Sequence, residues 1–348
     1  MNIPYTPLLR TLALVLAAGT AAAQDSSSVD FYGSLRLQAE SVQPDSTQRV
    51  DDYSAWRDAY SRLGLRGQTA LTPGLSAYGQ LELAVDAANL RLRDPYDQGD
   101  TARPDGERLR LAYAGLRGRY GALSYGQQWL PYYNAIAAPV DLFSSYYSGF
   151  ATYTAFRAAD TLAYASPEFQ GWSLAYAYTG RAGHERSTSR IADARRQYTL
   201  GYTYGETRLA AGLDDRGDAG YGRNRLYGLS ASHRTGALYL AAKYETFDTG
   251  NTTPGSFSSD GNRALNLLAS YTAGRNTFKL MRARVEGWGE HITHLGLDHQ
   301  YTDSLKLFVE YYRETETAAL TGPRGGLDDY DASLSGGRVL LAGLRWDF

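Results

Sequence analysis

Apolar and polar side chains alternate with a period of two along most of the chain beyond residue 23. In residues 197–205, the face that alternates with Gln, Thr and Gly carries Tyr198, Leu200, Tyr202 and Tyr204. A repeat of two is the repeat of a β-strand, because successive side chains of a strand point to opposite faces. No stretch in this part of the chain is apolar for eighteen residues in a row, which argues against transmembrane helices.

The same repeat recurs in sixteen segments, which predicts sixteen strands. These segments start near Val29, Ala59, Leu75, Glu107, Tyr120, Asp160, Gly171, Arg195, Thr207, Arg225, Ala237, Arg263, Thr277, His291, Ser304 and Gly336.

The connections between these segments alternate in length. Short turns such as residues 72–74 and 204–206 take turns with long polar loops such as residues 87–106 and 314–335. Outer-membrane barrels have tight periplasmic turns and long extracellular loops, and an even number of strands returns both termini to the periplasm. A soluble β-sandwich has no reason for this asymmetry. We therefore expect an all-β fold, a transmembrane antiparallel β-barrel of about sixteen strands.

The distribution of aromatic residues fits such a barrel. Large aromatic side chains lie near the ends of the apolar faces, where a membrane barrel places its interfacial girdles, at Tyr178, Tyr204, Tyr244, Tyr271, Tyr311 and Trp346. Lipid offers no hydrogen-bond partner, so the sheet must close on itself, and the first strand must meet the last. A barrel of about sixteen strands is too wide for side chains to fill, which predicts an aqueous channel.

The first 23 residues form a separate unit in this interpretation. Arg10 supplies a positive charge, residues 11–19 are apolar, and residues 21–23 are three alanines of the kind that signal peptidase requires. The apolar run is too short to span a hydrocarbon core of about 30 Å. We expect a signal peptide at residues 1–23 and a mature barrel domain at residues 24–348.

Composition and charge exclude several other classes of function. The chain has no Cys, which rules out a disulfide framework, thiolate metal sites and Cys nucleophiles. The net charge is only -2, so no strong field recruits nucleic acid. His291 and His294 lack the further ligands of a metal site, no Ser/His/acid grouping shares an inward face, and no Gly-rich phosphate loop occurs. We expect no enzyme activity, no cofactor and no bound metal.

Several short motifs resemble a known family. They are VDFYG at Val29, SRLGLRG at Ser61, YGQLEL at Tyr78, RLAYAGL at Arg110, YGQQ at Tyr125, SPEFQGWSLAYAY at Ser166 and the closing LRWDF. In this order and spacing the chain resembles the general diffusion porins of Gram-negative outer membranes over essentially its whole mature length. The resemblance implies a homotrimer, in which the early strands and the last strand pack together and residues 87–106 latch onto a neighbouring subunit.

The resemblance also implies the surroundings of the protein. It places the chain in the outer membrane among lipid and lipopolysaccharide, and it implies small hydrophilic solutes and ions as the transported molecules. The last residue, Phe348, resembles the signal that the barrel-assembly machinery reads, although an aromatic side chain at this place also packs at the lipid interface.

The candidate site is the narrow part of the channel. Residues 129–159 are far too long for a turn. They occupy the place of the third extracellular loop, which in resembling porins folds inward and constricts the lumen. Asp141 is the only carboxylate of this segment.

A basic wall is expected opposite this loop. Strand parity puts Arg36, Arg62, Arg66, Arg108 and Arg110 on the inward face, since neighbouring leucines, Leu109 and Leu111 among them, would face lipid. Arg62 and Arg110 match the basic wall of the family through their motifs, and Arg157 resembles its basic residue after the constricting loop. Glu82 matches an acid that lines the pore and is expected to pair with one of these arginines.

This arrangement predicts passive diffusion. An acidic loop facing a basic wall orders water, which an apolar solute must displace without replacing its hydrogen bonds. The chain departs from the family in having few loop carboxylates and in carrying Ser34 where enteric relatives tend to have Lys. Because arginine outnumbers acid, we expect a weak preference for anions.

Two other interpretations stay open. The aromatic residues of the loop could form a stacking path for sugars and make this a substrate-specific channel, or they could pin the loop to the wall by burial, which the sequence favours. They are Tyr132, Tyr133, Phe143, Tyr146, Tyr147, Phe150, Tyr153 and Phe156. An adhesin or an enzyme carried on the barrel is the less favoured alternative.

Overall fold

A computed structural model describes residues 27–48, 50–93, 109–180, 194–218, 222–322 and 335–348. The expected signal peptide at residues 1–23 lies outside these residues, as do Arg108 and most of the expected latch at residues 87–106. Within the described residues, no helix has the length and the apolar character needed to cross a membrane.

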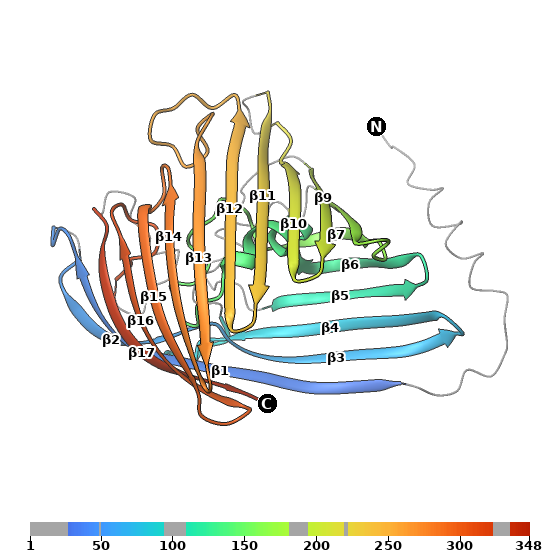
Figure 1. The fold of residues 1–348 in the computed structure, drawn as a ribbon, viewed down its shortest axis with the longest axis horizontal. Coiled ribbons are helices and arrows are strands. Elements are labelled where there is room, and N and C mark those ends of the chain that lie inside the picture. The colour runs from blue at the N-terminus through green and yellow to red at the C-terminus, as the bar shows by residue number, and fades with distance from the viewer. Residues whose placement is uncertain (1–26, 49, 94–108, 181–193, 219–221, 323–334) are drawn as a thin grey trace, which may run out of the picture.

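The described chain forms one closed antiparallel sheet (Figure 1). Its strands are β1 (Ser28–Pro44), β2 (Tyr53–Asp58), β3 (Ser61–Thr72), β4 (Leu75–Val85), β5 (Leu109–Gly118), β6 (Gly121–Trp129), β7 (Arg157–Ala165), β8 (Trp172–Thr179), β9 (Arg195–Tyr204), β10 (Thr207–Asp215), β11 (Asn224–Thr235), β12 (Leu238–Thr249), β13 (Arg263–Ala273), β14 (Asn276–Val285), β15 (Glu290–Gln300), β16 (Leu305–Glu314) and β17 (Gly337–Asp347). Except for β2 and β3, strands that are neighbours in sequence pair in space, and β1 pairs with β17 to close the barrel.

The expected sixteen barrel strands are confirmed, although seventeen strand segments are present. Both β2 and β3 pair with β1 and together make the second barrel strand. They are separated at Ala59 and Tyr60, where Tyr60 has a left-handed backbone with φ of 70°. The second strand therefore begins at Tyr53 rather than near Ala59, because the break at Tyr60 disturbs the two-residue repeat by which strands are recognised.

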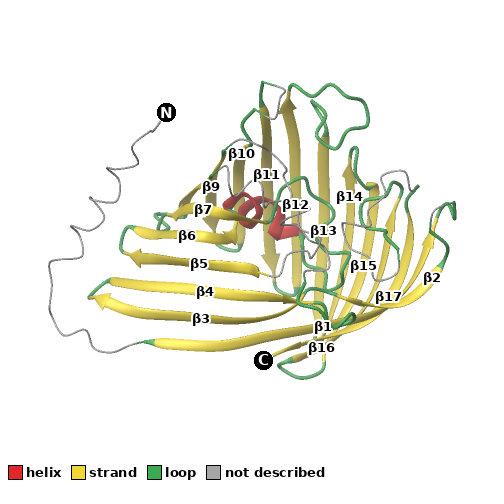
Figure 2. Ribbon diagram, turned by 180° about the vertical axis from the view of Figure 1, so that it is seen from behind, coloured by secondary structure: helices red, strands yellow, loops and turns green. Residues whose placement is uncertain are grey.

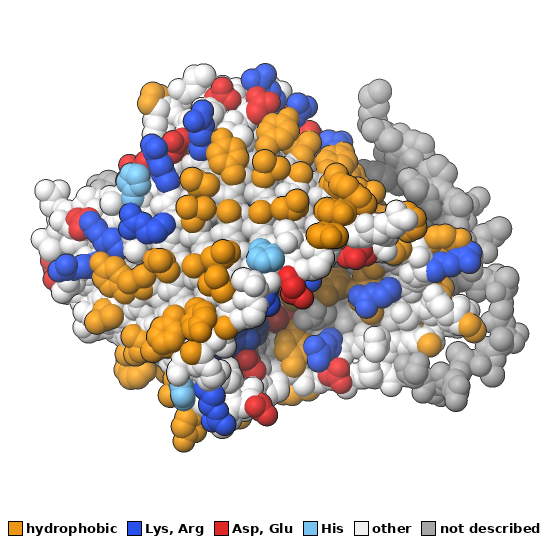
Figure 3. Space-filling model, viewed as in Figure 1, with side chains coloured by type: hydrophobic (Ala, Val, Ile, Leu, Met, Phe, Trp, Pro, Cys, Tyr) orange, Lys and Arg blue, Asp and Glu red, His pale blue; other side chains and the backbone are white. Residues whose placement is uncertain are grey.

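The two faces of the sheet are oriented as the pattern predicts. Along β1, Val29 and Phe31 are exposed on the outside, whereas Ser34, Arg36 and Gln38 are buried inside the barrel. Figure 3 shows the outer face over β11 to β14 as a band of apolar side chains. The expected girdle residues Tyr178, Tyr204, Tyr244, Tyr271 and Trp346 are all exposed. In a soluble protein this much apolar surface would be unusual, and lipid explains it.

One expectation about side-chain direction is wrong. Leu111 was expected on the lipid face, but its side chain is only 2% exposed. The register between β4 and β5 shifts next to Glu82, which pairs with Leu111, and Leu83, which pairs with Leu109. Arg110 is the extra residue of this bulge. A bulge puts two successive residues opposite one, so strict alternation fails there, and Arg110 still reaches the interior.

The orientation of the wall can be tested at Leu200, which lies on β9 and is 41% exposed. Leu200→Arg should lower the free energy of unfolding by roughly 2–4 kcal/mol, the cost of an arginine near the middle of the bilayer. Denaturant unfolding in lipid bilayers measures this change. Ser173→Arg, on the inward face of neighbouring β8, is the control and should cost much less. A larger loss for Ser173→Arg than for Leu200→Arg would mean that the faces are reversed.

Candidate functional site

The segment between β6 and β7 lies inside the barrel. We call residues 130–156 the inward loop. It contains two short helices, η1 (Tyr133–Ala137) and η2 (Ala138–Val140), and Figure 2 shows both helices within the ring of strands. Most of the largest buried apolar side chains of the described residues belong to this loop and to the strands that it contacts. The structure therefore has the inward-folded third loop that the sequence predicts.

A notch of two glycines receives the start of the loop. Tyr132 is fully buried, and its ring packs against Gly212 of β10 and Gly228 of β11. A methyl group at Gly228 would overlap the Tyr132 hydroxyl, and one at Gly212 would lie 3.0 Å from the Tyr132 ring. The Tyr132 backbone N–H donates to the side-chain oxygen of Gln197 at 3.0 Å. Glycine is needed in both strands because only it leaves room for the ring.

Polar side chains of the wall fix the rest of the loop. The carboxylate of Glu310 accepts from the Ser144 N–H at 2.7 Å, and Gln38 accepts from the Tyr146 N–H at 2.8 Å. Lys243 donates to the Ala151 carbonyl at 2.8 Å. A loop without regular structure needs such partners because its buried backbone groups have no others. The loop is thus held from strands on several sides of the lumen.

His294 belongs to this anchoring system. Its ring stacks on Phe143 with the ring centres 3.5 Å apart, and its Nε2 atom lies 2.9 Å from the carboxylate of Glu310. Lys279 bridges to Asp298 at 2.8 Å beside them. Among the described residues, no group of three or more His, Cys, Asp or Glu side chains is arranged to hold a metal. The histidine therefore acts as a packing and hydrogen-bonding residue.

The aromatic residues of the inward loop are mostly buried. Those that are fully or almost fully hidden are Tyr132, Phe143, Tyr146, Tyr147, Phe150, Tyr153 and Phe156. Tyr146 and Tyr147 meet edge to face, and Tyr147 stacks on Tyr312 of β16. Rings packed in this way bury apolar area and hold the loop on the wall. The burial favours the pinning role over a stacking path for sugars.

A polar cavity of about 420 Å³ remains between the loop and the opposite wall. Its lining residues are Arg36, Tyr60, Arg62, Arg110, Trp129, Tyr133, Asp141, Leu142, Phe143, Ser144, Ser148, Phe156, Arg157, Lys306 and Arg345. The structure thus brings together four of the expected arginines, Arg36, Arg62, Arg110 and Arg157, with the expected acid Asp141.

The basic wall is held in place by specific contacts. Arg110 forms an ion pair with Glu82 at 2.9 Å, and Arg62 lies 4.0 Å from the same carboxylate. The Nε–H of Arg36 donates to the Ser34 hydroxyl at 2.8 Å. The guanidinium of Arg157 lies over the Trp129 ring, 5.0 Å from its centre. These contacts fix the directions of the arginines while leaving them charged, since Arg stays protonated at any relevant pH.

Two cations of the wall were not among the expected site residues. Lys306 of β16 pairs across the sheet with Arg345 of β17, which pairs in turn with Arg36 of β1. Like charges directly opposite each other on neighbouring strands are destabilising. Ion pairs of Lys306 with Asp298 and of Arg345 with Asp347 offset part of this repulsion, and the row concentrates positive charge at the cavity. The sequence could have revealed these two cations. The two-residue repeat puts Lys306 and Arg345 on the inward face of the closing strands, and closure of the barrel brings β17 beside β1.

Arg66 lies apart from this wall. It is on β3, four residues beyond Arg62, and does not line the cavity. Its side chain is 64% exposed and pairs with Asp30 at 3.3 Å. The alternation of residues along a strand was therefore insufficient to assign Arg66 to the wall, because alternation gives the face of the strand but not the height in the channel.

The acidic side of the cavity is a single carboxylate on the loop. Asp141 accepts hydrogen bonds from the hydroxyls of Tyr133, at 2.8 Å, and Ser148. Burial and the nearby Asp141 charge raise the pKa of Tyr133 well above its usual value, so this hydroxyl remains a donor at neutral pH. Asp141 is thereby held as a fixed negative charge facing the arginines.

Phe348 ends the chain at the closure of the barrel. Its backbone N–H and carbonyl exchange hydrogen bonds with Gly33 at 3.0 and 2.8 Å. Its ring contacts Trp346 and Phe31 on the outer surface. The last residue thus completes the pairing of β17 with β1.

Comparisons with known proteins agree with this architecture. A family model described as Gram-negative porin matches residues 11–319. Outer membrane porin F of Xenorhabdus nematophila is 26% identical over 262 residues, which cover 66% of this chain and 66% of that relative. The chain thus matches slightly less than two thirds of the length of this curated relative.

Solved structures show the same fold. An anion-selective porin from Comamonas acidovorans superposes with a TM-score of 0.70 at 20% identity, over 93% of this chain and 100% of that one. The trimer form of OmpT from Vibrio cholerae superposes with a TM-score of 0.61 at 15% identity, over 93% and 100% of the two chains.

The glycine notch gives a test of how the loop is anchored. Gly228→Ala should displace Tyr132 and loosen the inward loop, because the added methyl group has no room. We expect a larger and noisier single-channel conductance in planar bilayers. Gly67→Ala, where the nearest atom would be 3.4 Å from the new methyl group, is the matched control and should behave like the unaltered protein. Identical conductance in both variants would show that the notch does not position the loop.

Proposed function

Because the chain belongs to the Gram-negative porin family, we propose that it forms a water-filled channel for the passive diffusion of small hydrophilic solutes and ions. As a member of this family it is an outer-membrane protein. The closed barrel supports the proposal, since a barrel of this strand number leaves an aqueous lumen. Diffusion through it involves no catalytic step.

The proposed ion selectivity rests on the charge of the side chains that line the cavity. Six basic side chains line it, against one carboxylate, Asp141. The further carboxylates Glu82, Asp298 and Asp347 pair with some of these cations and still leave an excess of positive charge. Clustered charge in a narrow channel with walls of low dielectric is focused toward the solute path. We propose a weak preference for anions, as the name of the Comamonas relative states for that protein.

The same cavity discriminates against apolar solutes. Fixed charges on opposite sides, Asp141 on the loop and the arginines on the wall, orient the water between them. A solute that displaces this water must offer hydrogen bonds in return, and an apolar molecule cannot. Small polar solutes therefore pass at lower cost than apolar ones of similar size.

The selectivity can be measured as a reversal potential in a salt gradient across planar bilayers. The unaltered protein should prefer anions, and Arg62→Gln should reduce this preference because it removes a charge from the cavity. Arg66→Gln removes an arginine from the same strand outside the cavity and should have little effect. The difference in anion preference between the unaltered protein and Arg62→Gln should decrease toward about 1 M salt, where the Debye length is only about 3 Å. Clear cation selectivity of the unaltered protein would refute the proposed charge preference.

We propose that the protein is a homotrimer. The wall of the early strands is rich in exposed apolar side chains, among them Phe31 of β1, Leu65 of β3 and Leu81 of β4. Leu65 and Leu81 are direct cross-strand neighbours and form one continuous surface. The trimer form of the Vibrio relative, which shares the fold, supports this assembly.

Single-channel recordings test the trimer directly. One insertion event should close in three equal steps, because each subunit carries its own channel. Leu65→Gln should weaken the trimer on unheated electrophoresis gels. Leu174→Gln on β8 loses the same apolar group from an exposed wall away from the early strands, and should leave the trimer intact. Single closures from every insertion would contradict the trimer.

Two features of biogenesis complete the proposal. We propose that residues 1–23 are a signal peptide that is removed before residues 24–348 form the barrel. We also propose that the closing strand carries the signal for the barrel-assembly machinery, with Phe348 as its last residue. The exposed rings of Trp346 and Phe348 support this role, since they are available to a partner on the outer surface.

A further inference from the structure

The cavity between the inward loop and the wall has an aromatic side as well as a basic one. Trp129 of β6 and two residues of the inward loop, Tyr133 and Phe156, form a cluster of rings that lines it. The ring centres of Trp129 and Tyr133 lie 4.8 Å apart, and those of Tyr133 and Phe156 lie 4.4 Å apart. Trp129 and Tyr133 are only half-buried, so part of each side chain is open to the cavity.

The ring cluster lies next to the basic wall. Trp129 pairs across the sheet with Arg157, whose guanidinium lies over the indole, 5.0 Å from its centre. Burial raises the pKa of the Tyr133 hydroxyl, and the nearby charges of Arg157 and Arg110 oppose this rise. Rings and guanidinium groups therefore meet in one cavity of about 420 Å³, within the range of roughly 300–1,000 Å³ that is usual for ligand sites.

This combination suits a solute that carries both a flat ring and a negative charge. A carboxylate finds donors on the basic wall, because the planar fork of a guanidinium matches its two oxygens. A flat ring gains contact with other rings in offset or edge-to-face packing. Asp141 repels a carboxylate from the side of the loop. The charged end of such a solute is therefore directed to the wall, and its ring to the ring cluster.

We propose that the cavity is a weak binding site for aromatic carboxylates, of which benzoate is a simple example, during their passage through the channel. A sugar would use only the rings, and an inorganic anion only the cations, whereas an aromatic carboxylate uses both. The inference rests on the proposed diffusion channel and adds the class of solute that the channel retains. Binding is weak because a tightly held solute would not leave the channel.

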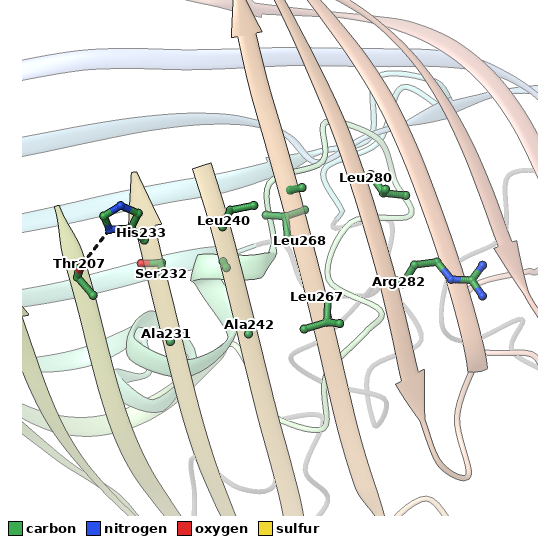
Figure 4. A pocket seen from close by; sticks show the side chains of 12 residues that line it. Thr207, Ala231, Ser232, His233, Leu240, Ala242, Leu267, Leu268, Leu280 and Arg282 are labelled. Carbon is green, nitrogen blue, oxygen red and sulfur yellow. Dashed lines mark hydrogen bonds between the residues drawn. The ribbon is translucent and has the colours of Figure 1, made fainter. Parts of the chain in front are cut away.

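A hollow of similar volume on the outer wall differs in its chemistry. It measures about 480 Å³ and is lined mostly by Ala and Leu side chains of β10 to β14, such as Leu240 and Leu267 (Figure 4). These two leucines are exposed on the lipid-facing side of the sheet, where a solute in the lumen does not reach them. Volume alone therefore does not identify a solute site, and the meeting of rings and cations in the lumen does.

The test measures the chloride current through the full-length protein in planar bilayers while benzoate is added. The salt is kept at about 0.1 M, where charges are screened less than at high salt. Benzoate should reduce the current saturably, whereas acetate, which has the same charge without the ring, should not. Trp129→Leu should raise the half-blocking concentration of benzoate by roughly three- to tenfold, the equivalent of one aromatic contact. Trp129→Phe keeps a ring and should restore most of the block.

Tyr113→Leu is the matched control for the loss of a ring. Tyr113 lies on β5 outside the lining of the cavity, where its ring packs edge to face with Tyr78 and its hydroxyl donates to Gln80 at 2.8 Å. Its removal should leave the block by benzoate unchanged. Electrophoretic mobility with and without heating shows that each variant has folded.

Three outcomes would overturn the inference while leaving the proposed channel in place. They are an equal block by acetate and benzoate, an unchanged half-blocking concentration in Trp129→Leu, and an equal block by cyclohexanecarboxylate, which has a ring without a π-face. In each case the chloride current itself is still observed. Purified protein that gives no conductance steps would instead overturn the proposed channel, and this inference with it.

Discussion

The closed ladder of backbone hydrogen bonds is the constraint on which the rest of the structure depends. In hydrocarbon no water is available for an unpaired N–H or C=O, so the sheet has no free edge, and β1 must pair with β17. Closure in turn fixes which side chains face inward. The outer wall can then be apolar, and the polar side chains collect around the lumen, in the reverse of the arrangement in a soluble protein.

This inversion explains how the interior can hold so many charges. A buried charge is far less costly with a partner than without one, and inward ionic groups form pairs such as Arg195 with Asp214 and Lys279 with Asp298. Lys306 and Arg345 also have carboxylate partners, Asp298 and Asp347, but together with Arg36 they form a row of like charges that lie directly opposite one another. Its repulsion is the electrostatic cost of the field that acts on the solute.

The sequence predicts the barrel well because its signal is local. A repeat of two along a strand, and a change from short to long connections, need no knowledge of distant residues. The break at Tyr60 and the bulge at Arg110 are not visible in this way, since they depend on the register with a neighbouring strand. Nor could the sequence show that Gly212 and Gly228 would receive Tyr132. Arg66 was grouped with Arg62 because parity does not report height in the channel.

The way the inward loop is held has a consequence for the order in which the protein is completed. Its anchors come from strands that are synthesised later: Tyr132 needs the notch in β10 and β11, and Ser144 bonds to Glu310, 166 residues further along the chain. Contacts so distant in sequence form late. A nascent barrel that still lacks β16 has no partner for this part of the loop. The narrowing of the passage therefore depends on the last strands of the barrel as much as on the loop itself.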